Sequence, residues 1–143
     1  MALAVAVSCS GEPPPQPQPR PWPEPPGPVA CVAPGMGLEG YVLIRRSDRR
    51  YHDHLGARVE FRGPSGRRIY FLLGIPGEVG EGLPLVGSPE LVDGSVGRFL
   101  GEEDRWVLAW RGEPPCEDMA VVGNEISAAA FRRALRNAAI LVR

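Results

Sequence analysis

The sequence predicts an α+β fold in which a mainly antiparallel β-sheet packs against one C-terminal amphipathic helix. Short alternating or apolar segments, separated by tight turns, fill residues 41–122. Helical spacing of apolar residues appears only after Ser127. Most of the 17 prolines precede residue 35, so we expect one globular β-rich domain at 38–143 of this 143-residue chain.

The first strands of the domain are predicted from apolar runs and alternation. Tyr41–Arg46 is a short apolar run that ends in charge. Ala57–Arg62 alternates apolar and charged residues, which is the period of a half-buried strand. Gly63–Gly66 is a turn, and Arg67–Leu73 is apolar enough for a central strand, so we expect a hairpin here. Gly74–Gly82 is expected to be a glycine-rich loop.

Further short strands are expected in the second half of the domain, at Leu83–Val86, Glu90–Val92, Ser95–Leu100, Arg105–Arg111 and Met119–Val122. The dipeptide Asp93-Gly94 is a strong hairpin-turn signal, and Glu102–Asp104 reads as an acidic turn. Alternation along residues 105–111 places Trp106, Leu108 and Trp110 on one face.

The C-terminal segment has the pattern of an amphipathic helix. Ser127 is a good N-cap residue. Apolar residues from Phe131 to Val142 repeat at helical spacing, with arginines on the opposite face. Arg143 suits the C-terminal end of such a helix because its charge complements the helix dipole.

The N-terminal segment 1–9 resembles the end of an export signal. Ala2–Ser8 is apolar and small, and Cys9 follows it as in a bacterial lipobox, which makes Cys9 a candidate lipidation site. Ala6 stands where lipoboxes usually carry Leu, and no basic residue precedes the apolar part, so we expect the signal to begin upstream of Met1. The alternatives are plain secretion, or a cytoplasmic regulatory protein with a disordered N-terminus.

Residues 10–35 are predicted to be a proline-rich disordered tether. Prolines recur from Pro13 to Pro28, and they exclude both helix and sheet. In the polyproline II conformation this stretch would span about 50 Å, which would hold a folded domain clear of a membrane. The competing interpretation is a ligand for a proline-recognition domain.

Three cysteines leave one unpaired if two form a bridge. If Cys9 carries lipid, Cys31 and Cys116 remain as a pair in an oxidising compartment. The sequence therefore predicts a disulfide from the end of the tether to the segment before the last strand. The alternative is two unrelated buried thiols.

One segment has residues that could bind a metal ion. In an extended segment, His52 and His54 would lie on the same side of Asp53, and Asp48 is close in sequence. Zinc sites usually need three or four ligands, and the chain has only two histidines, so His52 and His54 remain weak candidates. A metal-binding protein or metal-dependent enzyme is therefore the alternative function. No nucleophile motif appears, and we expect a non-catalytic protein without a cofactor.

The glycine-rich loop is the candidate binding segment, through Gly77, Glu78, Gly80 and Glu81. It lacks the Lys and Ser/Thr of a phosphate-binding loop, and its glutamates repel anions. A net charge of −1 argues against nucleic acid as a partner. We expect an unknown envelope protein or small ligand, with the membrane contacted through the lipid anchor.

Charge is unevenly distributed along the domain. Eight arginines against three acidic residues lie from Arg45 to Arg68, whereas ten acidic residues against three arginines lie from Glu78 to Asp118. Such a dipolar domain can orient on a partner or near anionic headgroups. Strands with solvated outer faces would give the same pattern.

The chain combines an Ala/Val-rich start, the tripeptide Cys9-Ser-Gly, a proline-rich tether and a compact domain. In this combination it resembles small uncharacterised lipoproteins of high-GC, actinobacteria-like bacteria. The C-terminal part is loosely similar to envelope modules with a Trp strand and a Ser-capped closing helix. The residues that carry this second likeness are Trp106–Trp110, Ala120–Asn124 and Ser127. Some such modules lie beside anti-sigma factors or bind lipoprotein cargo. The resemblance implies a cell-envelope binding or accessory lipoprotein, anchored to the membrane or secreted, and transfers no site residue.

Overall fold

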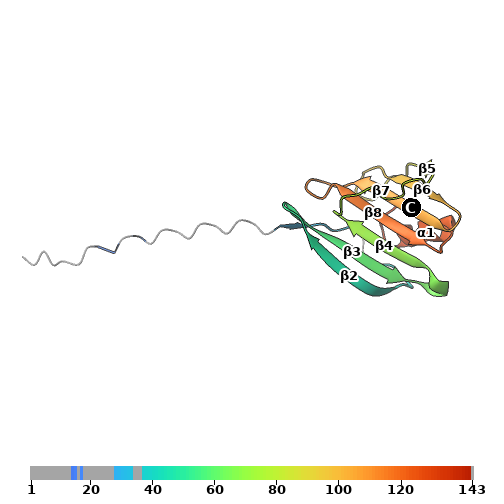
Figure 1. Cartoon of the computed structure of the whole chain (residues 1–143), viewed down its shortest axis with the longest axis horizontal. Coiled ribbons are helices and arrows are strands. Elements are labelled where there is room, and N and C mark those ends of the chain that lie inside the picture. Colours follow the sequence, from blue (N-terminus) through green and yellow to red (C-terminus); the bar gives the residue numbers. More distant parts are fainter. Residues whose placement is uncertain (1–13, 16, 18–27, 34–36, 143) are drawn as a thin grey trace, which may run out of the picture.

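The computed structural model describes residues 14, 15, 17, 28–33 and 37–142 (Figure 1). In this part of the chain, eight strands form one sheet in the order β2-β3-β4-β8-β7-β6-β5, and the short β1 also pairs with β3. Their bounds are β1 Val29–Ala30, β2 Val42–Arg50, β3 His54–Arg62, β4 Arg68–Leu73, β5 Leu85–Gly87, β6 Arg98–Glu102, β7 Arg105–Arg111 and β8 Asp118–Asn124. The helix α1 spans Ala128–Asn137, and one short 3-10 helix, Pro64–Gly66, lies between β3 and β4.

The predicted fold class is confirmed. Every strand pair recorded in the described residues is antiparallel except β1 with β3. Leu55 of β3 pairs with Arg50 of β2 and also with Ala30 of β1. Because a strand has only two edges, β1 must lie on the β4 side of β3. The sheet therefore ends in β2 on one edge and in β5 on the other.

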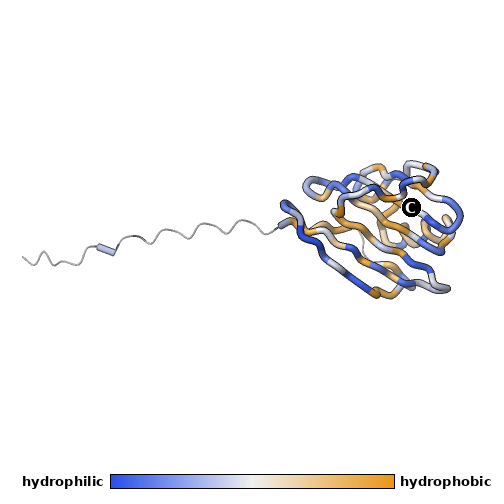
Figure 2. Tube along the Cα trace, viewed as in Figure 1, coloured by the Kyte–Doolittle hydropathy of each residue, from blue (hydrophilic) through white to orange (hydrophobic). Residues whose placement is uncertain are grey.

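The core lies between α1 and the sheet face that α1 covers, which we call the inner face. A row of apolar side chains in register crosses this face, consisting of Val59, Phe71, Val121, Leu108 and Phe99. Phe131 and Leu135 of α1 are fully buried against the same cluster. Figure 2 shows the hydrophobic segments gathered in the central strands. Alternation thus selects the buried side chains in β4, in β6 and in β3 from Ala57 onward.

Two adjacent strands are apolar on both faces. In β7, Val107 is fully buried although it points away from Trp106 and Leu108, and Ala109 is half-buried. In β8 every residue from Met119 to Gly123 is buried. The outer face of the sheet, opposite α1, is therefore apolar in its centre, which requires something to cover it.

The helix is shorter than predicted. It ends at Asn137, although the apolar spacing continues to Val142. Ala139 has a left-handed φ of 59°, which breaks the helical path. The N–H of Ile140 then donates to the carbonyl of Leu135 at 2.9 Å, and both residues are fully buried. Core packing therefore continues in a non-helical segment. Arg143 lies outside the described residues.

The strands predicted around Asp93-Gly94 also differ from the structure. Residues 90–92 form only isolated bridges, from Glu90 to Val96 and from Leu91 to Leu141. The turn itself is confirmed, since the N–H of Leu91 donates to the carbonyl of Ser95 at 2.8 Å. Leu91 is fully buried, so this segment packs on the C-terminal segment instead of extending the sheet.

The sheet begins within the stretch that the sequence assigned to the tether. Val29–Ala30 pairs with β3, and Cys31 and Ala33 are buried in the core. Pro14, Pro15 and Pro17 are exposed and without secondary structure where the structure describes them. The predicted signal segment, Cys9 included, and most of the tether lie outside the described residues.

The disulfide predicted from the cysteine count is present between Cys31 and Cys116. Their Cα atoms are 5.6 Å apart, and 85 residues separate them in sequence. The bridge joins the start of the domain to the segment that leads into β8, and it is compatible with an extracytoplasmic protein. In the described residues, no helix has both the length and the apolar character needed to cross a membrane.

Candidate functional site

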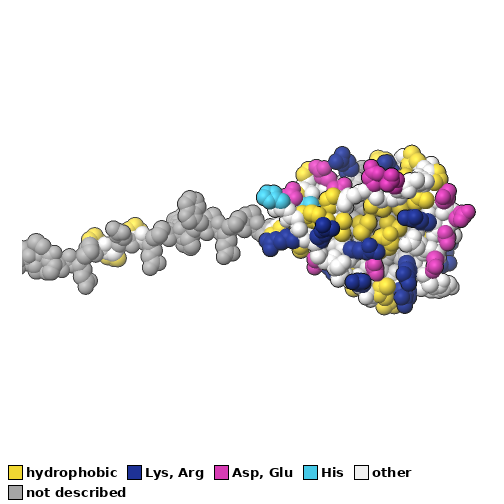
Figure 3. All heavy atoms as spheres, in the orientation of Figure 1, with side chains coloured by type: hydrophobic (Ala, Val, Ile, Leu, Met, Phe, Trp, Pro, Cys, Tyr) yellow, Lys and Arg dark blue, Asp and Glu magenta, His cyan; other side chains and the backbone are white. Residues whose placement is uncertain are grey.

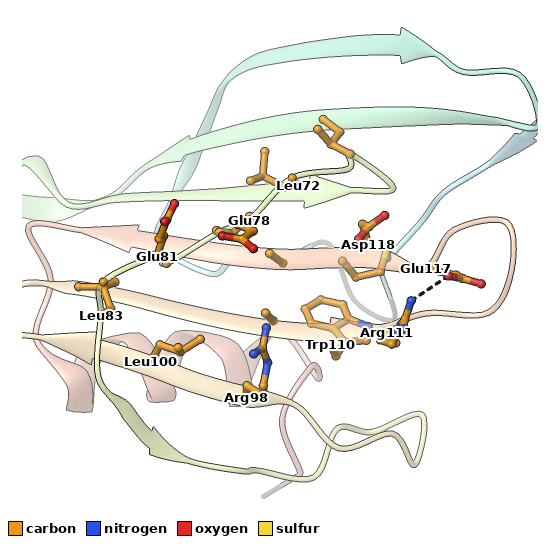
Figure 4. A pocket seen from close by; sticks show the side chains of 18 of the residues that line it. Leu72, Glu78, Glu81, Leu83, Arg98, Leu100, Trp110, Arg111, Glu117 and Asp118 are labelled. Carbon is orange, nitrogen blue, oxygen red and sulfur yellow. Dashed lines mark hydrogen bonds and ion pairs between the residues drawn. The ribbon is translucent and has the colours of Figure 1, made fainter.

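A groove of about 730 Å³ lies on the outer face of the sheet (Figure 4). Its base consists of four apolar side chains from four adjacent strands, namely Leu72, Leu100, Ala109 and Ala120. Residues 75–83, which we call the 75–83 loop, form the opposing side. The groove therefore uses the apolar centre of the outer face that α1 leaves uncovered.

Both ends of the 75–83 loop are fixed by backbone hydrogen bonds. Before the loop, the N–H of Gly74 donates to the carbonyl of Asp118 at 2.7 Å. After it, the N–H of Gly101 donates to the carbonyl of Pro84 at 3.0 Å. Between these ends Gly80 is buried, and a Cβ at this position would lie 3.4 Å from Val107 Cγ2. The loop thus packs onto the sheet at Gly80 and leaves the groove open beside it.

The rim of the groove carries more negative than positive charge. Arg111 and Glu117 form an ion pair with Nη2 and Oε2 3.0 Å apart. Figure 4 shows Glu78 and Glu81 on the loop side, Arg98 on the opposite side, and Asp118 beside the ion pair. Four acidic groups therefore line the groove together with two arginines. An apolar base with an acidic rim suits a ligand that has an apolar body and a positive group.

The four residues predicted to bind a ligand, Gly77, Glu78, Gly80 and Glu81, all line this groove. The strand residues that form the base of the groove were not predicted from the sequence. The available signal was that residues 119–123 are almost continuously apolar, with no polar outward position. An antiparallel strand of that kind needs cover on both faces.

His54 lies elsewhere, at the start of β3, and is buried. Its Nδ1 lies 2.7 Å from Oδ1 of Asp53, and its Nε2 lies 2.6 Å from the carbonyl oxygen of Gly74. Tyr51 stacks on the ring, with centroids 4.7 Å apart. Because a carboxylate and a carbonyl can only accept hydrogen bonds, both ring nitrogens donate and the imidazole is charged in this arrangement.

The contacts of His54 raise its pKa above the ordinary value. The hydrogen bond to Asp53 is the larger cause, and the bond to the Gly74 carbonyl adds to it, whereas burial opposes both. The same contact with His54 lowers the pKa of Asp53. Both ring nitrogens are thus engaged in hydrogen bonds instead of facing a shared ion site.

His52 does not join His54 in a cluster. His52 is exposed, whereas His54 points into the domain. The described residues contain no group of three His, Cys, Asp or Glu side chains placed to hold a metal ion. The structure therefore does not bring the two candidate metal ligands together.

Comparisons with protein-family models, with curated proteins and with solved structures find no match to this chain.

Proposed function

We propose that the chain is a non-catalytic binding lipoprotein of the cell envelope, anchored through lipid on Cys9, that takes its ligand in the groove under the 75–83 loop. The observation that carries this proposal is the groove itself, an apolar and acidic recess built on a disulfide-bridged sheet. The resemblance to tethered lipoproteins of high-GC bacteria supports the location.

The ligand class follows from the groove lining. Leu72, Leu100 and Ala109 are half-buried and offer an apolar surface that water covers poorly. Glu78 and Glu81 are exposed and, among the described residues, have no ion pair. We propose an elongated ligand with an apolar body and a cationic end, such as an apolar peptide segment that carries a basic side chain.

Matched amphiphiles test this proposal on the full chain. Dodecyltrimethylammonium and dodecyl sulfate, both well below their micelle concentrations, present the same alkyl body with opposite charges. We expect the cationic probe to shift the amide NMR signals of Leu72, Leu100, Ala109 and Ala120 in a saturable manner. The anionic probe should leave these signals nearly unchanged because the rim is acidic.

Two variants locate the binding. Ala109→Phe fills the base of the groove and should abolish saturable binding of the cationic probe. Glu78→Gln with Glu81→Gln should weaken binding of that probe, whereas the exposed pair Glu103→Gln with Glu113→Gln, which removes the same charge elsewhere, should not. Equal binding of both probes, or cationic binding that Ala109→Phe leaves intact, would contradict the proposal.

A further inference from the structure

A second surface on the outer face is strongly basic. The outer-face side chains of β2, β3 and β4 include five exposed arginines, namely Arg45, Arg49, Arg58, Arg62 and Arg68. Figure 3 shows dark blue side chains gathered over these strands. The register places Arg62 directly between Arg68 of β4 and Val42 of β2. We call these five residues the arginine face.

Few of these charges are neutralised. Arg58 Nη2 lies 2.8 Å from Oε1 of Glu60, and the Arg58 guanidinium also stacks over Tyr70 at 4.5 Å from the ring centroid. The other four arginines have no carboxylate within ion-pair distance among the described residues. On these three strands, Glu60 is the one acidic side chain that shares the outer face with them, because Asp48 lies on the inner side opposite Ala57.

Exposed aliphatic side chains adjoin the arginine face. Val42, Leu43 and Ile44, at the start of β2, are 67%, 53% and 43% exposed. The pairing of β2 with β3 shifts between Leu43 and Arg45, so Ile44 lies at a bulge. Val42 pairs with Arg62 and so lies on the outer face, and Ile44 lies at the bulge beside Arg45, whereas Leu43 pairs with Phe61 and faces the inner side.

Protection of an edge strand explains only part of this pattern. Charged residues on an edge strand prevent unwanted pairing, and this accounts for Arg45 and Arg49 on β2. It does not account for Arg62 and Arg68, which lie on strands paired at both edges. It also does not account for the exposed Val42–Ile44 segment, because such residues favour association.

We propose that the arginine face and the Val42–Ile44 segment together form a docking surface for an anionic phospholipid membrane. Guanidinium groups bind phosphate oxygens in pairs, and short aliphatic side chains enter the interface between headgroups and acyl chains. The acidic groups on the groove rim, among them Glu78 and Glu81, lie on the same outer face over β4, β8, β7 and β6, and an anionic membrane would repel them. This repulsion favours contact through the β2 end of that face. This inference requires no lipid on Cys9 and is independent of the ligand in the groove.

Vesicle binding by the full chain with Cys9→Ser, which cannot be lipidated, tests the proposal. We expect binding to vesicles of phosphatidylglycerol mixed with phosphatidylcholine, little binding to pure phosphatidylcholine, and weaker binding as salt is added. Arg62→Gln with Arg68→Gln should lower the affinity about thirtyfold, since each arginine near the surface contributes about a fivefold factor. Arg133→Gln with Arg136→Gln on α1 removes the same charge from exposed positions on the other side of the sheet and should leave the affinity nearly unchanged.

The aliphatic contribution is tested separately. Val42→Ser with Ile44→Ser should weaken vesicle binding, whereas Leu85→Ser with Val92→Ser, at exposed positions elsewhere, should not. Circular dichroism and thermal unfolding of each variant exclude loss of the fold as the cause. Equal weakening by the control pairs, absence of binding to anionic vesicles, or tighter binding to soluble polyphosphate or an acidic polypeptide than to vesicles would each overturn the proposal.

Discussion

The imidazole of His54 donates through Nε2 to the carbonyl oxygen of Gly74, at 2.6 Å, and so connects β3 to the residue at which the 75–83 loop begins. Cys31 of the disulfide lies against the same glycine, where an added Cβ would overlap its Sγ atom. The charged histidine, the bridge and the entrance to the groove loop thus share one small, buried region. Substitutions at His54, at the disulfide or at Gly74 should therefore change both the stability of the domain and the position of the 75–83 loop over the groove.

Stability should depend on pH through His54. Because the folded-state pKa is raised, the stabilisation is complete below the ordinary value of about 6.5 and is lost as pH rises through the folded-state pKa. We expect the free energy of unfolding, measured by urea denaturation, to fall as the pH rises above about 6.5. His54→Gln should remove this decline, and His52→Gln should retain it. An identical decline in His54→Gln would show that another group is responsible.

At acid pH, the free energy of unfolding should depend on the titration of Asp53. Its pKa is lowered chiefly by the hydrogen bond from His54, so its contribution is present above about pH 4 and is lost as pH falls further. In His54→Gln the carboxyl group of Asp53 should titrate closer to its ordinary value. The side-chain carbon shift of Asp53, followed by NMR through the acid range, measures this directly. An unchanged midpoint would mean that the hydrogen bond does not form in solution.

Gly74→Ala should lower the free energy of unfolding much more than Gly82→Ala does. Both glycines have a left-handed φ, of 64° and 83°, so each substitution costs about 1–2 kcal/mol in backbone strain. A Cβ at Gly82 meets nothing within 4 Å, whereas one at Gly74 overlaps Cys31 and lies 3.0 Å from His54 Cδ2. We expect an additional loss of about 1–3 kcal/mol for Gly74→Ala. Equal losses in chemical denaturation would argue against the close contact.

Removal of the disulfide should destabilise the domain by about 4–5 kcal/mol in the chain-entropy model for a loop of this length. Cys31→Ser with Cys116→Ser is the test, measured by urea denaturation without reductant. Cys9→Ser is the matched control because Cys9 is not part of the bridge, and it should leave the free energy of unfolding unchanged. A loss below about 1 kcal/mol in the double variant would indicate that other contacts fix the start of the sheet.

Alternation and turn residues were enough to predict most of the sheet. Arg105–Arg111 has the predicted bounds, with Trp106, Leu108 and Trp110 on the inner face. The hairpin of β3 and β4 and the Ser127 cap are also confirmed, the latter by the hydrogen bond from the Ala130 N–H to Ser127 Oγ at 3.1 Å. In these segments local preference and tertiary packing agree.

The errors come from segments in which tertiary contacts decide the conformation. Leu141 fits helical spacing, but it is buried together with Ile140 by a chain reversal at Ala139 that spacing cannot reveal. Val29–Ala30 has too few residues to show a strand pattern. The predicted disulfide at Cys31 was the one feature that indicated a link between this stretch and the domain. The base of the groove comes from four strands whose order in the sheet differs from their order in sequence, which a linear pattern does not encode.

The intact mass of the protein purified from membranes of its native host tests the proposed function most directly. We predict a chain that begins at Cys9, carries a diacylglyceryl group there, and has the mass of a bridged Cys31–Cys116 pair. A soluble protein that retains Met1 and has free thiols at both other cysteines would contradict the proposal that this domain acts in the cell envelope.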